Sequence, residues 1–370
     1  MTISGFAVND LWSVRQQRGR EAGVGSSEVA VLAVATIGFV LLFDYTNGFH
    51  DASNIIGTTI ASRAMTPIQS VIIVGTCEFL GPLLGGTAVA NTIGKVVTIG
   101  DLPPLVSTGI ILCGIVGAIF WNILTWWFGI PSSSSHALVG GLAGAVVVAV
   151  GSDHVVWGLQ ELANYRLVGV TKVLLALVLS PLIGFWVGFT MHRLLCFVLR
   201  GARPSVNKPL RGLQFLTAAG LAFSHGANDA QKSMGIITLV LLLSGRQARF
   251  EVPTWVTLAC ASAITLGILS GGWRIVRTVG FGIYKVRPIH ALGAQLTSAA
   301  VILSASALGA PVSTTHVVSS SIMGIGSSER PKAVRWAKAT DIVSTWVITM
   351  PGAALVAIVT YFAMRSVLGS

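Results

Sequence analysis

Two segments of the sequence place an aspartate among glycine and amide side chains inside long apolar runs. Residues 47–54 have the sequence NGFHDASN and residues 225–232 have HGANDAQK. An aspartate at mid-membrane costs about 2.5–3.5 kcal/mol on insertion scales, so each one needs a partner or a function. Two carboxylates would repel an anion, and Asp51 and Asp229 therefore predict a bound cation: a proton, sodium or a divalent metal. The alternative is that each aspartate caps the helix that follows a break in the run.

Two turns rich in hydroxyl groups form a second pair of motifs. Residues 131–136 have the sequence PSSSSH and residues 311–316 have PVSTTH, and each turn precedes a run of small residues. Hydroxyls and free backbone N–H groups at a helix N-terminus bind anions, with help from the helix dipole. The alternative is simple capping together with hydrogen bonds between helices. We expect the following residues to bind an oxyanion: Ser132, Ser133, Ser134, Ser135, Ser313, Thr314, Thr315, Asn228 and Gln231.

Amide, acidic and basic side chains beside these motifs complete the candidate site. The carbonyls of Asn47 and Asn54 would join the two aspartates at the cation. Glu78 lies inside an apolar run and has no acidic counterpart in the second half, so it is a further candidate for coupling. Histidine changes charge near neutral pH, which suits a proton relay; the alternative is an ordinary buried, hydrogen-bonded side chain. The candidates for a relay or for support of the site are His50, His136, His225, His316 and Lys232.

The motifs occur once in each half of the chain, in the same order and at nearly the same spacing. Lysine and arginine gather in three segments, residues 193–211, 274–287 and 330–338, which are expected to face the cytoplasm. Each copy then crosses the membrane an odd number of times, so the two copies have opposite orientations. Inverted repeats of this kind place transport sites near the midplane, on interrupted helices.

The composition indicates a membrane protein. Of 370 residues, 53% are hydrophobic and only 10% are charged, whereas soluble domains average about 25% charged residues. The net charge of +11 comes from cations in short loops, so it indicates orientation in the membrane and not binding of nucleic acid. We predict an all-α, polytopic protein with two inverted repeats, interrupted helices, re-entrant hairpins and about 10–12 membrane segments. The expected parts are an N-terminal polar segment (1–27), a first repeat (28–200), a basic cytoplasmic link (201–211) and a second repeat (212–370).

The motifs resemble those of the inorganic phosphate transporter family known as PiT, over nearly the whole chain. That family carries a GAND-type signature and a P-x-S-x-T-H-type turn in each half, which residues 226–229 and 311–316 match. The first half departs from the signature with His50 in place of asparagine, and the second has Lys232 where the signature has asparagine. The chain looks most like the bacterial low-affinity branch, whose members are thought to use protons and to carry a neutral metal–phosphate complex. Sodium-coupled relatives keep the asparagine.

The resemblance implies a symporter in the plasma (inner) membrane that imports inorganic phosphate by alternating access, with proton coupling. It places Asp51 and Asp229 at cations, including a divalent metal carried with the phosphate, and it implies no resident cofactor. The expected partners are phosphate and the lipid bilayer. Sodium coupling, sulfate transport, an anion channel and a homodimer stay open. An enzyme is not expected, because the serine, histidine and aspartate residues are duplicated and no GxSxG elbow occurs.

Overall fold

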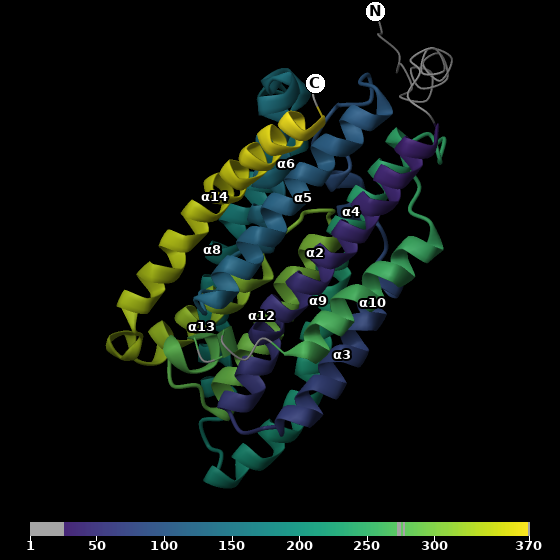
Figure 1. Cartoon of the computed structure of the whole chain (residues 1–370). Coiled ribbons are helices and arrows are strands. Elements are labelled where there is room, and N and C mark those ends of the chain that lie inside the picture. The colour runs from purple at the N-terminus through teal and green to yellow at the C-terminus, as the bar shows by residue number, and fades with distance from the viewer. Residues whose placement is uncertain (1–25, 272–274, 277, 369–370) are drawn as a thin grey trace, which may run out of the picture.

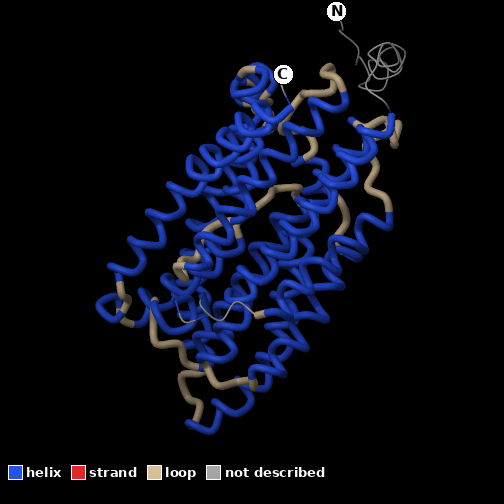
Figure 2. The backbone as a smooth tube through the Cα atoms, in the orientation of Figure 1, coloured by secondary structure: helices blue, strands red, loops and turns tan. Residues whose placement is uncertain are grey.

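The computed structural model describes residues 26–271, 275–276 and 278–368 of the chain (Figure 1). These residues are mostly helical and include no strand (Figure 2). The first half contains α2 (Ser26–Ala61), α3 (Pro67–Leu84), α4 (Ala88–Ile93), α5 (Pro104–Trp127), α6 (Ser134–Val150), α7 (Leu159–Ala163) and α8 (Gly169–Val198). The second contains α9 (Asn207–Leu243), α10 (Thr254–Ser270), the π-helical turn η4 (Thr278–Gly282), α12 (Pro288–Ala307), α13 (Thr314–Glu329) and α14 (Trp336–Leu368). Most of the predicted N-terminal polar segment lies outside the described residues.

Six of the described helices are long and apolar enough to cross a membrane: α2, α3, α5, α8, α12 and α14. One span needs about 20 apolar residues, and α6 and α10 are apolar but have only 17 residues each. The outward faces of α8 and α14 carry large apolar side chains, such as Trp186 and Val347, which are 62% and 71% exposed. Such faces suit contact with lipid, and the predicted all-α polytopic fold is confirmed.

The long helices α2 and α9 continue without interruption through the two aspartate motifs. The prediction of helix breaks at these motifs is therefore wrong, and so is the alternative in which the aspartates cap a helix. The motif glycines serve close packing instead. A Cβ at Gly48 would lie 2.1 Å from the Ile264 carbonyl oxygen, and one at Gly226 would lie 2.3 Å from that of Glu78. Small residues let membrane helices approach backbone to backbone in this way.

The helices are interrupted at the two hydroxyl turns. α5 ends at Trp127 and α6 begins at Ser134, and a similar turn separates α12 from α13. Gly129 and Gly309 have positive φ angles of 66° and 63°, which glycine adopts without steric cost. The serines and threonines of both turns are buried, and each helix pair packs together as a hairpin. Re-entry of these hairpins into the membrane stays a prediction.

The helix contacts within and between the two halves of the chain come in matched pairs. α13 contacts α8 and α6 contacts α14, while α12 contacts α9 and α5 contacts α2. Likewise α3 contacts α9 and α10 contacts α2. Exchanging the two halves converts each contact into its partner, as a pseudo-two-fold axis would. In Figure 1, α8 and α14 lie on one side of the bundle and α3 and α10 on the other, with α2 and α9 between them. The opposite membrane orientation of the copies stays a prediction.

Candidate functional site

Asp51, in the C-terminal half of α2, is buried and held by hydroxyls and a histidine. Thr314 Oγ1 donates to its Oδ2 and Thr315 Oγ1 donates to its Oδ1, each at 3.0 Å. His50 Nδ1 lies 2.9 Å from Oδ1. Both threonines begin α13, so the acid of the first repeat is bound by the hydroxyl turn of the second.

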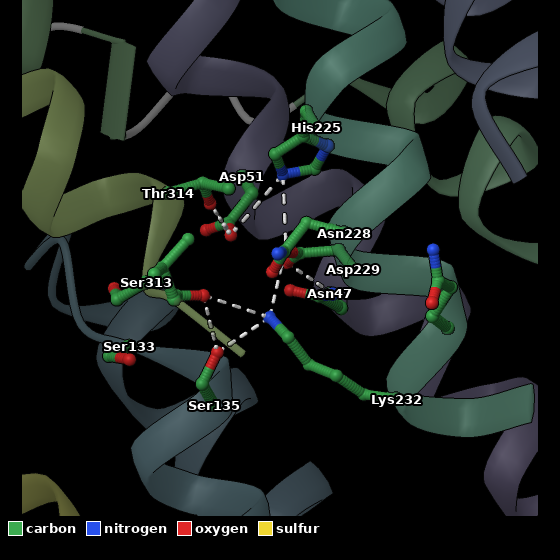
Figure 3. Close-up of polar contacts among 12 residues, drawn as sticks. Asn47, Asp51, Ser133, Ser135, His225, Asn228, Asp229, Lys232, Ser313 and Thr314 are labelled. Atoms are coloured by element: carbon green, nitrogen blue, oxygen red, sulfur yellow. Dashed lines mark hydrogen bonds and ion pairs between the residues drawn. The ribbon is translucent and has the colours of Figure 1, made fainter. Parts of the chain in front are cut away.

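Asp229, in the middle of α9, is buried and paired with a lysine one turn further along. Lys232 Nζ lies 2.7 Å from Oδ1, and Asn47 Nδ2 of α2 donates to Oδ2 at 3.1 Å. The lysine amine also donates to Ser135 Oγ at 2.5 Å and to the Val312 carbonyl oxygen at 3.3 Å. Figure 3 shows the side chain extending from α9 toward the two turns. One cation thus joins the acid of α9 to the hydroxyl turn of each repeat.

His225 lies between the two aspartates and Glu78. Its Nε2 is 3.5 Å from Asp51 Oδ2 and 3.7 Å from Asp229 Oδ2, and its Nδ1 is 2.5 Å from Glu78 Oε1. One ligand atom each from Asp51, His225 and Asp229 lie within 4.8 Å of one another. The structure therefore brings the two aspartates together across the interface of the repeats. They lie close enough for a single metal ion to be coordinated by both of them and by His225.

One serine in each turn caps the helix that follows. Ser133 Oγ accepts a hydrogen bond from the His136 N–H at 3.2 Å, and Ser313 Oγ accepts one from the His316 N–H at 3.3 Å. Ser134 is buried in the first turn of α6. Capping, the alternative that the sequence left open, accounts for Ser133 and Ser313. The hydroxyls of Ser132, Ser135, Thr314 and Thr315 bond to the aspartates, to the lysine or to neighbouring helices.

Two hydroxyl groups that the sequence did not single out connect the aspartate motifs to the hairpins. Thr125 Oγ1, near the end of α5, lies 2.8 Å from Ser132 Oγ and 3.3 Å from His50 Nε2. Asn228 Nδ2 donates to Ser306 Oγ, near the end of α12, at 2.9 Å. His50 and Asn228 each precede an aspartate, so each repeat uses this position to hold its hairpin. Serine and threonine in apolar helices usually bond to their own backbone, so no sequence signal marks this pair.

Gln231 is not placed where the sequence predicts. Its Oε1 accepts from the Val89 N–H at 2.8 Å, and its Nε2 donates to the carbonyl oxygens of Ala227 at 2.6 Å and Gly85 at 3.2 Å. Both ends of the amide are used by backbone groups in α4, just before it and on α9 itself, so the structure does not support Gln231 as an anion ligand. Asn54, by contrast, donates to Thr315 Oγ1 at 2.9 Å and lies in the site.

The four histidines divide into two pairs. His50 and His225 contact the aspartates, as described above. The rings of His136 and His316 lie 4.8 Å apart, and Trp346 of α14 stacks on His316 at 3.8 Å. Within the described residues, no hydrogen bond connects the second pair to an acid. The geometry therefore favours the first pair for a proton relay and the second for packing behind the turns.

The sequence matches the phosphate transporter family over residues 47–357, a range that contains all of these motifs. The chain belongs to this family. A Bacillus subtilis protein described as a probable low-affinity inorganic phosphate transporter is 41% identical, over 91% of this chain and 98% of that protein. A Rhizobium meliloti protein of the same description is 42% identical, over 90% of this chain and 96% of that protein.

The fold is also similar to a solved structure, described as the sodium-dependent phosphate transporter. The TM-score is 0.79 at 24% sequence identity, over 92% of this chain and 99% of the other; this similarity concerns the fold alone. Membership of the family confirms the resemblance seen in the motifs. Together with the six apolar helices it confirms a multi-pass protein of the cell membrane. Because the family consists of transporters, the prediction that the chain is not an enzyme is confirmed as well.

Proposed function

We propose that this chain imports inorganic phosphate together with protons, as a symporter that works by alternating access. The observation that supports this most directly is the position of Lys232, whose amine binds Asp229, Ser135 and the Val312 carbonyl oxygen at once. An anion at the turns would meet this cation and the N-termini of α6 and α13. Phosphate is the substrate named for the relatives in Bacillus subtilis and Rhizobium meliloti.

The donors that would bind phosphate are bonded to protein groups in this conformation. Thr314 and Thr315 donate to Asp51, and Lys232 donates to Ser135. Phosphate would accept hydrogen bonds from the same hydroxyls and from the amine. Asp51 would then lose both threonine donors in a buried place, which favours uptake of a cation to neutralise it. Binding of phosphate would in this way promote binding of the coupling cation.

Sodium is the second candidate for the coupling cation. Asn47 Oδ1 and Asn54 Oδ1 have no hydrogen-bond partner within the described residues, and hard cations prefer oxygen ligands of this kind. A proton is favoured by two features: a lysine already neutralises Asp229, and two histidines stand beside Asp51. A divalent metal bound to the phosphate would use Asp51, His225 and Asp229, and the lysine would have to leave Asp229.

Uptake of labelled phosphate into proteoliposomes tests the proposal. We expect accumulation when the outside is acidic, no response to a sodium gradient, and competition by arsenate but not by sulfate. Removing divalent metals with a chelator shows which form of phosphate is carried. Current without accumulation would indicate a channel, and accumulation that follows the sodium gradient alone would replace the proton with sodium.

The two aspartates are the variants that test the assigned site. Asp51→Asn and Asp229→Asn are each expected to lower uptake about 10- to 100-fold, because each loses hydrogen bonds to a charged group worth about 1.5–3 kcal/mol. Asp153→Asn, at an exposed acid between α6 and α7, is the matched control and should transport normally. Normal uptake by both site variants would remove the aspartates from the mechanism.

A further inference from the structure

One buried acid has no part in the site described so far. Asp44 lies on α2 two helical turns before Asp51, or about 10 Å along the helix, and its side chain is fully buried. Ser233 Oγ of α9 donates to its Oδ1 at 2.5 Å, and Oδ2 has no hydrogen-bond partner in the described part of the chain. The matching position in the second repeat is Ala222, so this acid belongs to the first repeat alone.

The surroundings of Asp44 favour a neutral carboxyl group. The titratable groups that face it are Asp229 and Lys232 on α9 and Cys260 on α10, whose thiol is a weak hydrogen-bond donor to the carboxyl group. The lysine amine is already bound to Asp229 at 2.7 Å. A buried carboxylate with an unpartnered oxygen and no cation of its own would cost several kcal/mol. A protonated Asp44 avoids this cost, and its carbonyl oxygen can accept the hydrogen bond from Ser233.

We propose that Asp44 binds and releases one of the protons that are carried with phosphate; this inference rests on the proposed function above. Its link to the site is α9, where Ser233 directly follows Lys232. When Asp44 loses its proton, its carboxylate competes with Asp229 for the lysine amine. Protonation of Asp44 thus decides where that amine is held.

The lysine amine is also the contact that joins the two hydroxyl turns, through Ser135 and the Val312 carbonyl oxygen. While Asp44 is neutral, the amine stays on Asp229 and holds both turns. When Asp44 is ionised, the amine is drawn toward it and phosphate at the turns loses its cation. The proton on Asp44 would in this way control the affinity of the turns for phosphate.

The position of Asp44 also suits a proton that enters from outside. It lies closer than Asp51 to the N-terminal end of α2, and Ser233 lies closer than Asp229 to the C-terminal end of α9. The basic segment 193–211 is expected to put the start of α9 inside and its end outside, and the predicted inversion of the repeats puts the start of α2 outside as well. A proton from the outer solution would reach Asp44 first and would leave toward the inside once the hairpins have moved. This step moves one proton and requires no other reactant.

Asp44→Asn in proteoliposomes tests the proposal, because an amide imitates the protonated acid permanently. Two assays are compared: exchange of labelled for unlabelled phosphate at equal pH, and accumulation driven by a pH gradient. Exchange should continue close to the rate of the natural chain, since the proton need not leave. The accumulation ratio of phosphate should be lower than in the natural chain by about tenfold for each pH unit of the gradient, because one proton fewer is carried with each phosphate.

Controls separate this inference from the proposed function. Asp341→Asn, at an exposed acid paired with Lys338, should leave both assays unchanged. Gradient-driven accumulation by Asp44→Asn equal to that of the natural chain would overturn the role of Asp44 and leave the symporter intact. Absence of phosphate exchange in the natural chain would instead overturn the proposed function. If Asp44→Asn does not fold, Ser233→Ala decides: it should change the pH at which uptake is half-maximal, and an unchanged pH profile would overturn the inference.

Discussion

The two central aspartates occupy equivalent positions in the two repeats, but they are bound differently. Asp51 is held by two threonine hydroxyls and flanked by histidines, whereas Asp229 forms an ion pair with Lys232. The position that matches Lys232 in the first repeat is Asn54. Symmetry therefore sets the positions of the acids, and the exchanged side chains around them, Lys232 for Asn54 and Asn228 for His50, make their surroundings differ. Asp229 has a built-in cation, and we propose that Asp51 binds the exchangeable one.

Lys232→Asn gives the second repeat the residue of the first. Of the variants that alter this difference, we expect it to cause the largest loss of stability. Removing one partner of a buried ion pair destabilises a protein by about 3–5 kcal/mol, because Asp229 would stay buried without its cation. Thermal unfolding in detergent measures the loss. The double variant with Asp229→Asn should be more stable than Lys232→Asn alone, since it removes the unpaired charge as well.

The same variant tests whether the lysine stands in for a transported cation. If it does, uptake by Lys232→Asn should gain a dependence on sodium, because Asp229 then needs another partner. Lys172→Asn is a suitable control, since in the described part of the chain its amine donates to two neutral groups, Thr92 Oγ1 and the Leu308 carbonyl oxygen. Equal stability of the single and double variants would show that Lys232 does not hold Asp229.

A smaller effect is expected from two serines of the first turn. Ser135 bonds to the lysine amine and Ser133 caps α6. The alanine variant of the first should therefore affect phosphate binding, and that of the second should affect stability. Ser135→Ala should raise the KM for phosphate about tenfold or more, the range of a hydrogen bond to a charged group. Ser133→Ala should cost about 1 kcal/mol of stability and change the KM less. The KM for phosphate and the stability are measured on the same preparations of each variant. Identical KM values in the two variants would remove Ser135 from the binding site.

Much of the fold follows from the sequence because its signals are local. The apolar runs predict the long helices, and the repeated motifs predict that Asp51 and Asp229 meet. The predicted helix breaks failed for a physical reason. Glycine in an apolar run signals an interruption or a close contact equally well, and only the packed structure shows that Gly48 touches the backbone at Ile264.

Contacts between distant segments set the limit of prediction for the site. Gln231 lies in the motif, but its amide is used by the backbone in and just before α4, a six-residue helix with no clear signal in the sequence. Thr125 and Ser306 look like ordinary hydroxyls of apolar helices, and their partners come from another part of the chain. Residue types therefore predict the chemistry of the site, while the partners of each side chain depend on how the two repeats pack.

The smallest expected effect concerns an acid outside the spanning helices. Glu329, at the end of α13, accepts a hydrogen bond from Tyr284 Oη at 2.6 Å and pairs with Arg287. Burial opposes ionisation, but the bonds from Tyr284 and Arg287 outweigh it and lower the pKa of Glu329 from 4.5 to about 2. A lowered pKa in the folded state means that this carboxylate stabilises the fold fully above pH 4.5. The contribution is lost as the pH falls from there toward 2.

Glu329→Gln is therefore expected to lower the unfolding temperature at neutral pH and to flatten its decline in acid. The effect should not exceed about 1 kcal/mol, because Arg287 is largely exposed and such pairs are screened by solvent. Glu251→Gln, at an exposed acid before α10, is the matched control and should show neither change. Phosphate uptake at neutral pH should be normal in both variants, because an acid that is paired at the surface serves stability. Loss of uptake without loss of stability in Glu329→Gln would instead connect this end of α13 to the transport cycle.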